Sequence, residues 1–264
     1  MMRISIGPVS CHATSSSEVK ISLEKYGLNR DPCLVVTPYS EMIVWAEERT
    51  ELQEAIEQAD WSLPDGKGIL WASLYLYQDL SFFQSMWYIL NHSVEIYHTF
   101  PEQISGSNLI YDLLNLAHMH TWRLYVVGGS AKVAQAFRSY LDQYYPRVVL
   151  VNHYTDLVNL EDQELYQDIS DRYVDVVFVA LSTPDQEVWA HRLIRYLREQ
   201  HSTGVVCCFG GSLDMVVGKQ QRAPQAFRNI GLEWLWRLGY QPLRLRRAYR
   251  ATWQFMNIIR SYKE

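Results

Sequence analysis

Residues 174–181, with the sequence VDVVFVAL, form an almost unbroken apolar run that leads into the polar turn Ser182-Thr183-Pro184. A short apolar run that is rich in β-branched side chains and bounded by turn residues predicts a strand covered on both faces, as in parallel sheets. Residues 205–209, VVCCF, have the same character and end at Gly210-Gly211. Together these two segments predict the centre of a buried parallel sheet.

The same pattern recurs on both sides of this centre. Shorter apolar runs at residues 34–36, 124–127 and 148–151 predict three further strands. Apolar residues at three- and four-residue spacing predict helices over residues 41–59, 131–145, 162–173 and 186–200. The alternation of strands and helices indicates an α/β fold with a Rossmann-like parallel sheet and flanking helices.

Composition excludes several classes of protein. In 264 residues, 48% are hydrophobic and 20% are charged, which excludes a disordered chain and a disulfide-stapled miniprotein. The net charge of −5 excludes a dedicated nucleic-acid binder. However, residues 219–264 hold ten Lys/Arg and two acids, so this end carries +8 while the rest carries −13. A basic end on an acidic body indicates an anionic partner there, such as a phosphate or a membrane headgroup.

The cysteines and the N-terminus indicate a cytoplasmic protein. Cys11, Cys33, Cys207 and Cys208 show no zinc-site spacing and are expected to be reduced, buried thiols. Residues 1–10 contain no apolar run of the kind that signal peptides have. The longest uncharged stretch, residues 80–94, is about five residues short of a bilayer span. We therefore expect no transmembrane helix.

Residues 74–100 interrupt the alternating pattern. They contain eight aromatic residues but only Asp79 and Glu95 as charges. This insertion could be a lid or a membrane-facing element, or it could be an extra helix that packs on the core. Both interpretations are open from the sequence.

The chain ends in a basic amphipathic segment, so the sequence predicts a main domain over residues 1–238 and a helical C-terminal appendage over residues 239–264. The apolar stripe of the appendage consists of Leu245, Tyr249, Trp253, Met256 and Ile259, with arginines on another face. Such a helix suits an anionic membrane surface. Docking on its own domain is the alternative.

Four polar turns are candidates for ligand binding. Asp65 lies in the turn Pro64-Asp65-Gly66, and Gly128-Gly129-Ser130 joins a predicted strand to a helix whose N-terminus favours phosphate. The turns at residues 182–187 and 209–214 follow the next two predicted strands. Because parallel strands end at one edge of a sheet, where α/β proteins bind ligands, we expect these turns to converge.

Six motifs occur in a fixed order: Asp65-Gly66 with Trp71-Ala72-Ser73, Val127-Gly128-Gly129, Pro184-x-Gln186-Glu187-x-Trp189, Gly210-Gly211-Ser212-x-Asp214, Gly218-x-x-x-Arg222-Ala223-Pro224, and Gly231-Leu232-Glu233-Trp234-Leu235-x-Arg237-Leu238. Over residues 35–247 the chain thereby resembles the WecG/TagA/CpsF glycosyltransferase family. The last two motifs are the most specific ones.

The resemblance implies an inverting glycosyltransferase that needs no metal or other cofactor. Its partners would be a nucleotide-sugar donor, usually UDP-linked, and a polyprenyl-diphosphate-linked sugar acceptor in envelope or exopolysaccharide synthesis. It would act as a peripheral protein on the inner face of the plasma membrane. Asp65 corresponds to the family's proposed base, while Thr37 and Gln186 correspond to residues that position substrate.

The resemblance also assigns residues to donor or diphosphate binding. They are Gly128, Gly129, Ser130, Pro184, Glu187, Gly210, Gly211, Asp214, Arg222, Arg237, Arg244 and Arg247. Without a metal, both diphosphates need guanidinium groups, which bind phosphate oxygens in a bidentate manner. In the family, a basic tail of this kind binds the membrane and contributes arginines to the site.

Departures from the family pattern keep alternatives open. Gln103 and Asn108 stand where members usually have an arginine and an aspartate, and residues 152–155 replace a usual Gly-Tyr-Phe turn. The donor is therefore open between N-acetylmannosamine, glucose and another hexose. A catalytically degenerate member that binds glycolipid or a partner enzyme is the alternative function. A nicotinamide-dependent oxidoreductase is a further rival, although the glycine fingerprint is missing. Homo-oligomerisation is open.

Overall fold

The computed structural model describes residues 2–91, 99–202, 204–218 and 249–263. In this part of the chain, six parallel strands form one sheet in the order β4-β3-β8-β7-β5-β6. Their bounds are β3 Cys33–Val36, β4 Trp61–Ser62, β5 Arg123–Gly128, β6 Val149–Tyr154, β7 Val176–Ala180 and β8 Val205–Cys208. The predicted α/β fold with a parallel sheet is confirmed.

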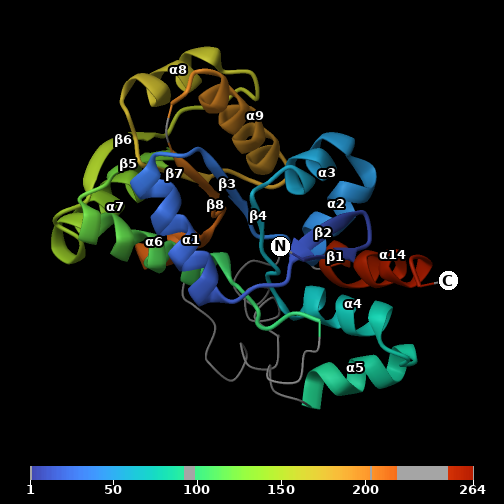
Figure 1. The fold of residues 1–264 in the computed structure, drawn as a ribbon. Coiled ribbons are helices and arrows are strands. Elements are labelled where there is room, and N and C mark those ends of the chain that lie inside the picture. The colour runs from blue at the N-terminus through green and yellow to red at the C-terminus, as the bar shows by residue number, and fades with distance from the viewer. Residues whose placement is uncertain (1, 92–98, 203, 219–248, 264) are drawn as a thin grey trace.

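Helices cover both faces of this sheet (Figure 1). One face packs against α2 (Ser40–Glu48), α3 (Thr50–Glu57), α8 (Gln163–Asp171) and α9 (Asp185–Glu199). The other face packs against α1 (Ser16–Asn29), α6 (Gly106–His120), α7 (Ala131–Tyr144) and the short α10 (Ser212–Val216). This arrangement explains why the inner strands read as continuous apolar runs, because both of their faces are covered, whereas the edge strand β6 is only partly buried.

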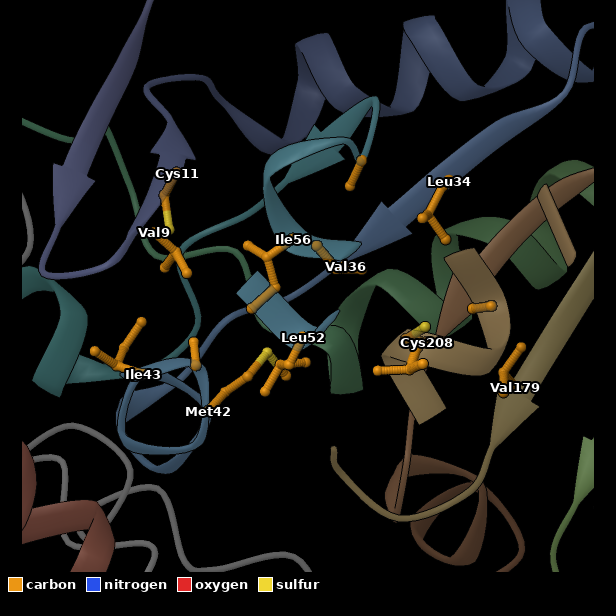
Figure 2. Packing of buried hydrophobic residues seen from close by; sticks show 14 of the residues in the cluster. Val9, Cys11, Leu34, Val36, Met42, Ile43, Leu52, Ile56, Val179 and Cys208 are labelled. Atoms are coloured by element: carbon orange, nitrogen blue, oxygen red, sulfur yellow. The ribbon is translucent and has the colours of Figure 1, made fainter. Parts of the chain in front are cut away.

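Strand residues alternate strictly between two hydrophobic clusters. Val179 and Cys208 belong to the cluster under α9, together with Leu34 and Val36 of β3 (Figure 2), whereas Cys207 belongs to the cluster under α6. Adjacent side chains of a strand point to opposite faces, so Cys207 and Cys208 lie on opposite sides of the sheet. All four cysteines are free and buried, as the sequence predicts.

A hairpin at the N-terminus was not predicted from the sequence. β1 (Arg3–Ile6) pairs antiparallel with β2 (Val9–His12), and the hairpin packs beside β4 and α3. The hydroxyl of Ser62 in β4 donates to the carbonyl of Ser10, at 2.7 Å. Arg3 donates to the carbonyl of Glu57 at the end of α3, at 2.7 Å. The hairpin thus covers the end of the short edge strand β4.

The single helix predicted over residues 41–59 is wrong, because two helices occupy this segment. Arg49, which has an extended backbone at φ −132° and ψ 103°, separates α2 from α3. The change of direction lets α3 pack on α9 while α2 packs on the C-terminal segment. Tertiary packing decides this break, since residues 41–59 contain neither proline nor glycine.

The aromatic insertion contains the last turn of α4 (Lys67–Tyr77) and all of α5 (Phe82–Asn91), and these two helices pack together. The Trp71 ring of α4 meets the Phe82 ring of α5 edge to face, with centroids 5.7 Å apart. The Trp71 indole N–H donates to the buried Ser85 hydroxyl, at 3.0 Å. The structure therefore confirms an extra helix packed on the core through one of its faces. Residues 92–98 lie outside the described residues.

The described end of the C-terminal appendage docks on α2 and α4. It consists of one turn of π-helix, η3 (Arg250–Gln254), followed by α14 (Phe255–Ser261). Phe255 and Ile259 are buried, whereas Tyr249 and Trp253 of the predicted stripe are more than half exposed. Phe255 and Ile259 stand four residues apart in α14 and therefore share the face that packs on the domain, whereas Trp253 lies in the preceding π-helical turn. Leu245 lies outside the described residues.

Within the described ranges, no helix combines the length and the hydropathy that a membrane crossing requires.

The docking of α14 is testable at Phe255, whose ring packs against Trp71 with centroids 6.0 Å apart. Phe255→Ala is expected to weaken docking by about 3 kcal/mol, because Phe-to-Ala changes in a core leave a large cavity. Amide hydrogen exchange of residues 255–261 is then expected to become about 100-fold faster. Trp253→Ala is the matched control. Equal exchange rates in the two variants would contradict the docking.

Candidate active site

The predicted ligand-binding turns lie at one edge of the sheet. Thr37 follows β3 directly, and Asp65 comes three residues after β4. Gly128 ends β5, Ser182 comes two residues after β7, and Gly210 comes two residues after β8. All six strands of this sheet are parallel, so these positions share its carboxyl edge, the usual location of ligand sites in α/β proteins.

Asp65 is held by backbone hydrogen bonds on both sides. Its own N–H donates to the carbonyl of Pro38, at 2.9 Å, which fixes the turn beside β3. Its Oδ2 accepts from the N–H of Gly106, the first residue of α6, at 3.3 Å. A helix N-terminus carries partial positive charge, so the start of α6 attracts this half-buried side chain.

Gly106 also brings Thr37 into the site. A methyl group placed on Gly106 would lie 3.1 Å from Thr37 Oγ1 and 3.9 Å from a ring carbon of Phe209. A side chain at residue 106 would therefore press on the buried Thr37 hydroxyl. The absence of a side chain lets α6 start between Asp65 and Thr37.

Gln186 is fixed from two directions. Its Oε1 accepts from the N–H of Gly210, at 2.7 Å, and its Nε2 donates to Oε1 of Glu187, at 2.6 Å. Glu187 is fully buried and also accepts from the Thr183 hydroxyl, at 3.3 Å. The structure thus places Glu187 behind Gln186, where it orients the amide, while the turn after β8 is tied to the start of α9.

These contacts make one continuous group. Asp65 contacts Gly106, which lies against Thr37 and Phe209, and Phe209 is followed by Gly210, which binds Gln186. The three residues that the resemblance assigns to catalysis follow β3, follow β4 and lie in α9, and this chain of contacts connects them. Sequence reasoning missed Gly106, which is 41 residues from Asp65.

The turn after β5 provides a second part of the site. Gly128 has φ +97°, and a methyl group on it would lie 2.5 Å from the carbonyl oxygen of Ala180 in β7. The Ser130 hydroxyl accepts from the N–H of Val133, at 3.4 Å, and so caps α7. The predicted passage from a strand through glycines into a helix N-terminus is present, and Gly129 and Ser130 are exposed there.

His153 of β6 supports this turn. Its Nε2 lies 2.9 Å from the carbonyl oxygen of Gly128 and donates to it in the neutral tautomer with the proton on Nε2. Burial lowers the pKa of His153 and the charge of Arg138 lowers it further, while the hydrogen bond to Gly128 opposes both. The sequence indicates only a structural role for this histidine, which agrees with its contact.

A cleft of about 350 Å³ opens at the ends of β5, β6 and β7. Gly128, Gly129 and Ser182 line it, together with Asp185 of α9. Its outer wall is the loop after β6, with Thr155, Asp156, Leu157, Val158 and Leu160. Sequence reasoning noted Thr155, in the turn that departs from the family pattern, but missed the rest of this wall. The available signal was the rule that all parallel strands end at the same edge, because the loop follows a predicted strand.

The remaining predicted residues lie around this group. Pro184 is buried at the start of α9, Gly211 is exposed before α10, and Asp214 is half-buried within α10. Arg222, Arg237, Arg244 and Arg247 lie outside the described residues. Lys67, which the sequence analysis did not single out, begins α4 beside Asp65, and burial lowers its pKa.

Gln103 and Asn108, the two departures from the family pattern, flank the N-terminus of α6. Gln103 is half-buried, and Asn108 is exposed in the first turn of the helix. Both positions are therefore close in sequence to Gly106, the residue that contacts Asp65. In the described part of the chain, no three His, Cys, Asp or Glu side chains are grouped in a way that could hold a metal ion.

Comparison with known proteins gives two findings. Residues 4–263 match the family described as "Glycosyl transferase WecG/TagA/CpsF family". Proteins of Staphylococcus aureus strains NCTC 8325, COL and MSSA476 are 28% identical to the chain over 203 residues, which is 77% of this chain and 70% of each relative. All three are named N-acetylglucosaminyldiphosphoundecaprenol N-acetyl-beta-D-mannosaminyltransferase.

The close approach of Gly128 to β7 makes a stability prediction. Gly128→Ala is expected to lower the free energy of unfolding by about 2–4 kcal/mol, because its positive φ and its contact with a backbone oxygen both oppose a side chain. Gly211→Ala is the control, since its φ is −73° and a methyl group there meets nothing within 4 Å. Urea denaturation measures both, and equal losses would refute the geometry.

The lowered pKa of His153 predicts a pH dependence. Below the ordinary histidine pKa of about 6.5, the unfolded chain takes up a proton that the folded chain resists, so stability falls as pH decreases. His153→Gln keeps an N–H donor for Gly128 but does not titrate. Urea denaturation at pH 7 and pH 5 is expected to show a smaller loss of stability in the variant, and an unchanged loss would contradict this assignment.

Proposed function

Because the chain belongs to the WecG/TagA/CpsF glycosyl transferase family, we propose that it transfers a hexose or N-acetylhexosamine, with inversion, from a UDP-sugar to a sugar carried on a polyprenyl diphosphate. The product would be a lipid-linked intermediate of an envelope or exopolysaccharide polymer. The observation that carries the proposal is the convergence of Thr37, Asp65 and Gln186 around Gly106 and Gly210.

Asp65 is the proposed general base. Its carboxylate takes the proton of the acceptor hydroxyl while the acceptor oxygen bonds to the anomeric carbon of the donor sugar. The bond between that carbon and the UDP oxygen breaks at the opposite side, so the configuration inverts and UDP leaves. The N–H of Gly106 on Oδ2 supports this role, because it holds the carboxylate in one orientation.

Thr37 and Gln186 are proposed to position the substrates. The amide of Gln186 is held by Gly210 and Glu187, and such a rigid amide is suited to fix a sugar hydroxyl or the acceptor oxygen. Loss of either residue is expected to misplace the reacting atoms rather than to remove the base.

The cleft beside Gly128 and Gly129 is the proposed donor site. Its place at the ends of β5 and β7 suits a nucleotide diphosphate, since the N-terminus of α7 offers unpaired backbone N–H groups to phosphate. We assign Arg222, Arg237, Arg244 and Arg247 to the two diphosphates, where guanidinium groups would stabilise the departing UDP without a metal ion.

The names of the Staphylococcus aureus relatives supply the first substrates to test. These relatives are named as N-acetylmannosaminyl transferases that act on an N-acetylglucosaminyl-diphosphoundecaprenol acceptor. The acceptor and the basic residues 239–264 support action at the inner face of the plasma membrane, as a peripheral protein. The departures at Gln103 and Asn108 keep glucose and other hexoses in the donor panel.

The function is tested with a panel of UDP-sugars and a short-chain polyprenyl-diphosphate-linked sugar, with product measured by mass spectrometry. Transfer from one donor is expected, and added EDTA is expected to leave its rate unchanged. Asp65→Asn keeps the size of the side chain but removes the base, so the turnover number is expected to fall about 10²–10⁴-fold.

Asp79→Asn is the matched control, because Asp79 is an exposed acid after α4. Its turnover is expected to equal that of the unaltered chain. Near-normal turnover of Asp65→Asn would overturn the assignment of the base. No transfer from any donor by a folded chain would favour a member of the family that binds glycolipid without catalysis.

A further inference from the structure

The outer face of α5 is aromatic and uncharged. Phe82, Ser85 and Ile89 face the core, whereas Phe83 and Trp87, one helical turn apart, are 83% and 62% exposed. None of the ten residues of α5 carries a charge. A helix on a water-exposed surface normally has charged residues on its outer face, so contact of the apolar outer face of α5 with water is unfavourable.

The C-terminal segment adds positive charge beside this face. The guanidinium of Arg260 in α14 lies 5.4 Å from the centre of the Phe82 ring, at the start of α5. The ammonium of Lys263 donates to the carbonyls of Tyr75 and Leu80, at 2.6 and 2.7 Å, on either side of the turn between α4 and α5. Cations therefore border the exposed aromatic residues.

Acidic side chains also lie near this surface, since Asp79 is exposed in the turn before α5 and Glu47 of α2 accepts from the Tyr262 hydroxyl, at 3.0 Å. Residues 80–91 and 249–263 contain no acid but three cations, Arg250, Arg260 and Lys263. Trp253 of η3 is exposed as well, at 57%. Exposed aromatic residues that are rimmed by cations match the boundary between acyl chains and anionic headgroups, where aromatic rings insert and cations meet phosphates.

We propose that α5 is a membrane-contacting element, with Phe83 and Trp87 inserted at the headgroup–acyl boundary of an anionic lipid surface while Arg260 contacts its phosphates. This adds a contact in the aromatic insertion to the one expected of the basic tail. The proposal depends on the proposed function only for the origin of the lipid, since binding to vesicles needs no transfer reaction.

The position of α4 links this surface to the candidate active site. α4 begins two residues after Asp65 and spans eleven residues, which corresponds to about 16 Å. Its other end forms the turn that carries α5. With α5 on the membrane, α4 would connect the lipid surface with the carboxylate, so a sugar on a diphosphate headgroup needs to extend only a short distance from the bilayer.

Co-sedimentation with vesicles tests the proposal. The unaltered chain is expected to bind vesicles with 30% phosphatidylglycerol and to bind pure phosphatidylcholine vesicles at least about tenfold less. The double variant Phe83→Ser/Trp87→Ser is expected to lower the partition coefficient on anionic vesicles about tenfold or more. Phe83→Leu/Trp87→Leu restores apolar area and is expected to retain binding within about threefold.

The matched control is Tyr144→Ser, an exposed aromatic residue on α7, which is expected to leave binding unchanged. Circular dichroism melting separates loss of the fold from loss of binding. Equal binding by the unaltered chain and the Ser double variant, when both are folded, would overturn the role of α5. A concentration-dependent dimer that the Ser variant abolishes, without vesicle binding, would instead assign this face to a second copy of the chain.

The assay is independent of the transferase assay. Vesicle binding without transfer would leave the membrane surface established and count against the proposed reaction. Transfer to the short-chain acceptor without vesicle binding would support the proposed reaction and count against the membrane surface.

Discussion

Burial of a parallel sheet on both faces is the constraint on which the rest of this structure depends. Such a sheet cannot be joined by tight hairpins, so each connection crosses one face as a helix and returns the chain to the same starting edge. All strand ends then collect at the opposite edge. Cys207 and Cys208 show this constraint locally, because the two neighbours lie in different hydrophobic clusters. At the site, the same constraint places Thr37, Asp65 and Gln186 at one edge of the sheet.

Backbone groups of glycines then join the separate strand ends into one site. Gly106 donates its N–H to Asp65 and, because it has no side chain, leaves room for Thr37. Gly210 donates its N–H to Gln186. A backbone N–H is present whatever the neighbouring side chains are, so these hydrogen bonds can persist when the sequence around them changes. Departures such as Gln103 and Asn108 can therefore alter the rim of the site while the arrangement of its centre persists.

The sequence predicts β3, β5, β7 and β8 well because each is a nearly continuous apolar run, whereas β6 extends through Asn152, His153 and Tyr154 beyond the predicted residues 148–151. The sequence does not predict β4, which has two residues and depends on the hairpin beside it. The break at Arg49 follows from the different partners of α2 and α3, and the inward position of Phe255 follows from the docking of α14 on α2 and α4. Such features depend on contacts between distant segments, and no local pattern records them.

The sequence likewise identifies some residues of the candidate site and misses others. The motifs identify Asp65, Gln186 and the glycines after β5 and β8, since each stands beside a recognisable strand end. They do not identify Gly106 or the loop from Thr155 to Leu160, which join the site only through the packing of α6 and the position of β6.

The bond from Lys263 to the carbonyl of Tyr75 joins residues 188 positions apart in the chain. During synthesis at about 5–20 residues per second, the turn between α4 and α5 waits about 10–40 s for this amine. Throughout that interval the aromatic insertion has emerged while the helix that borders it has not. Until α14 emerges, Trp71 and Phe82 thus lack the Phe255 ring and the Arg260 guanidinium that pack against them in the complete fold.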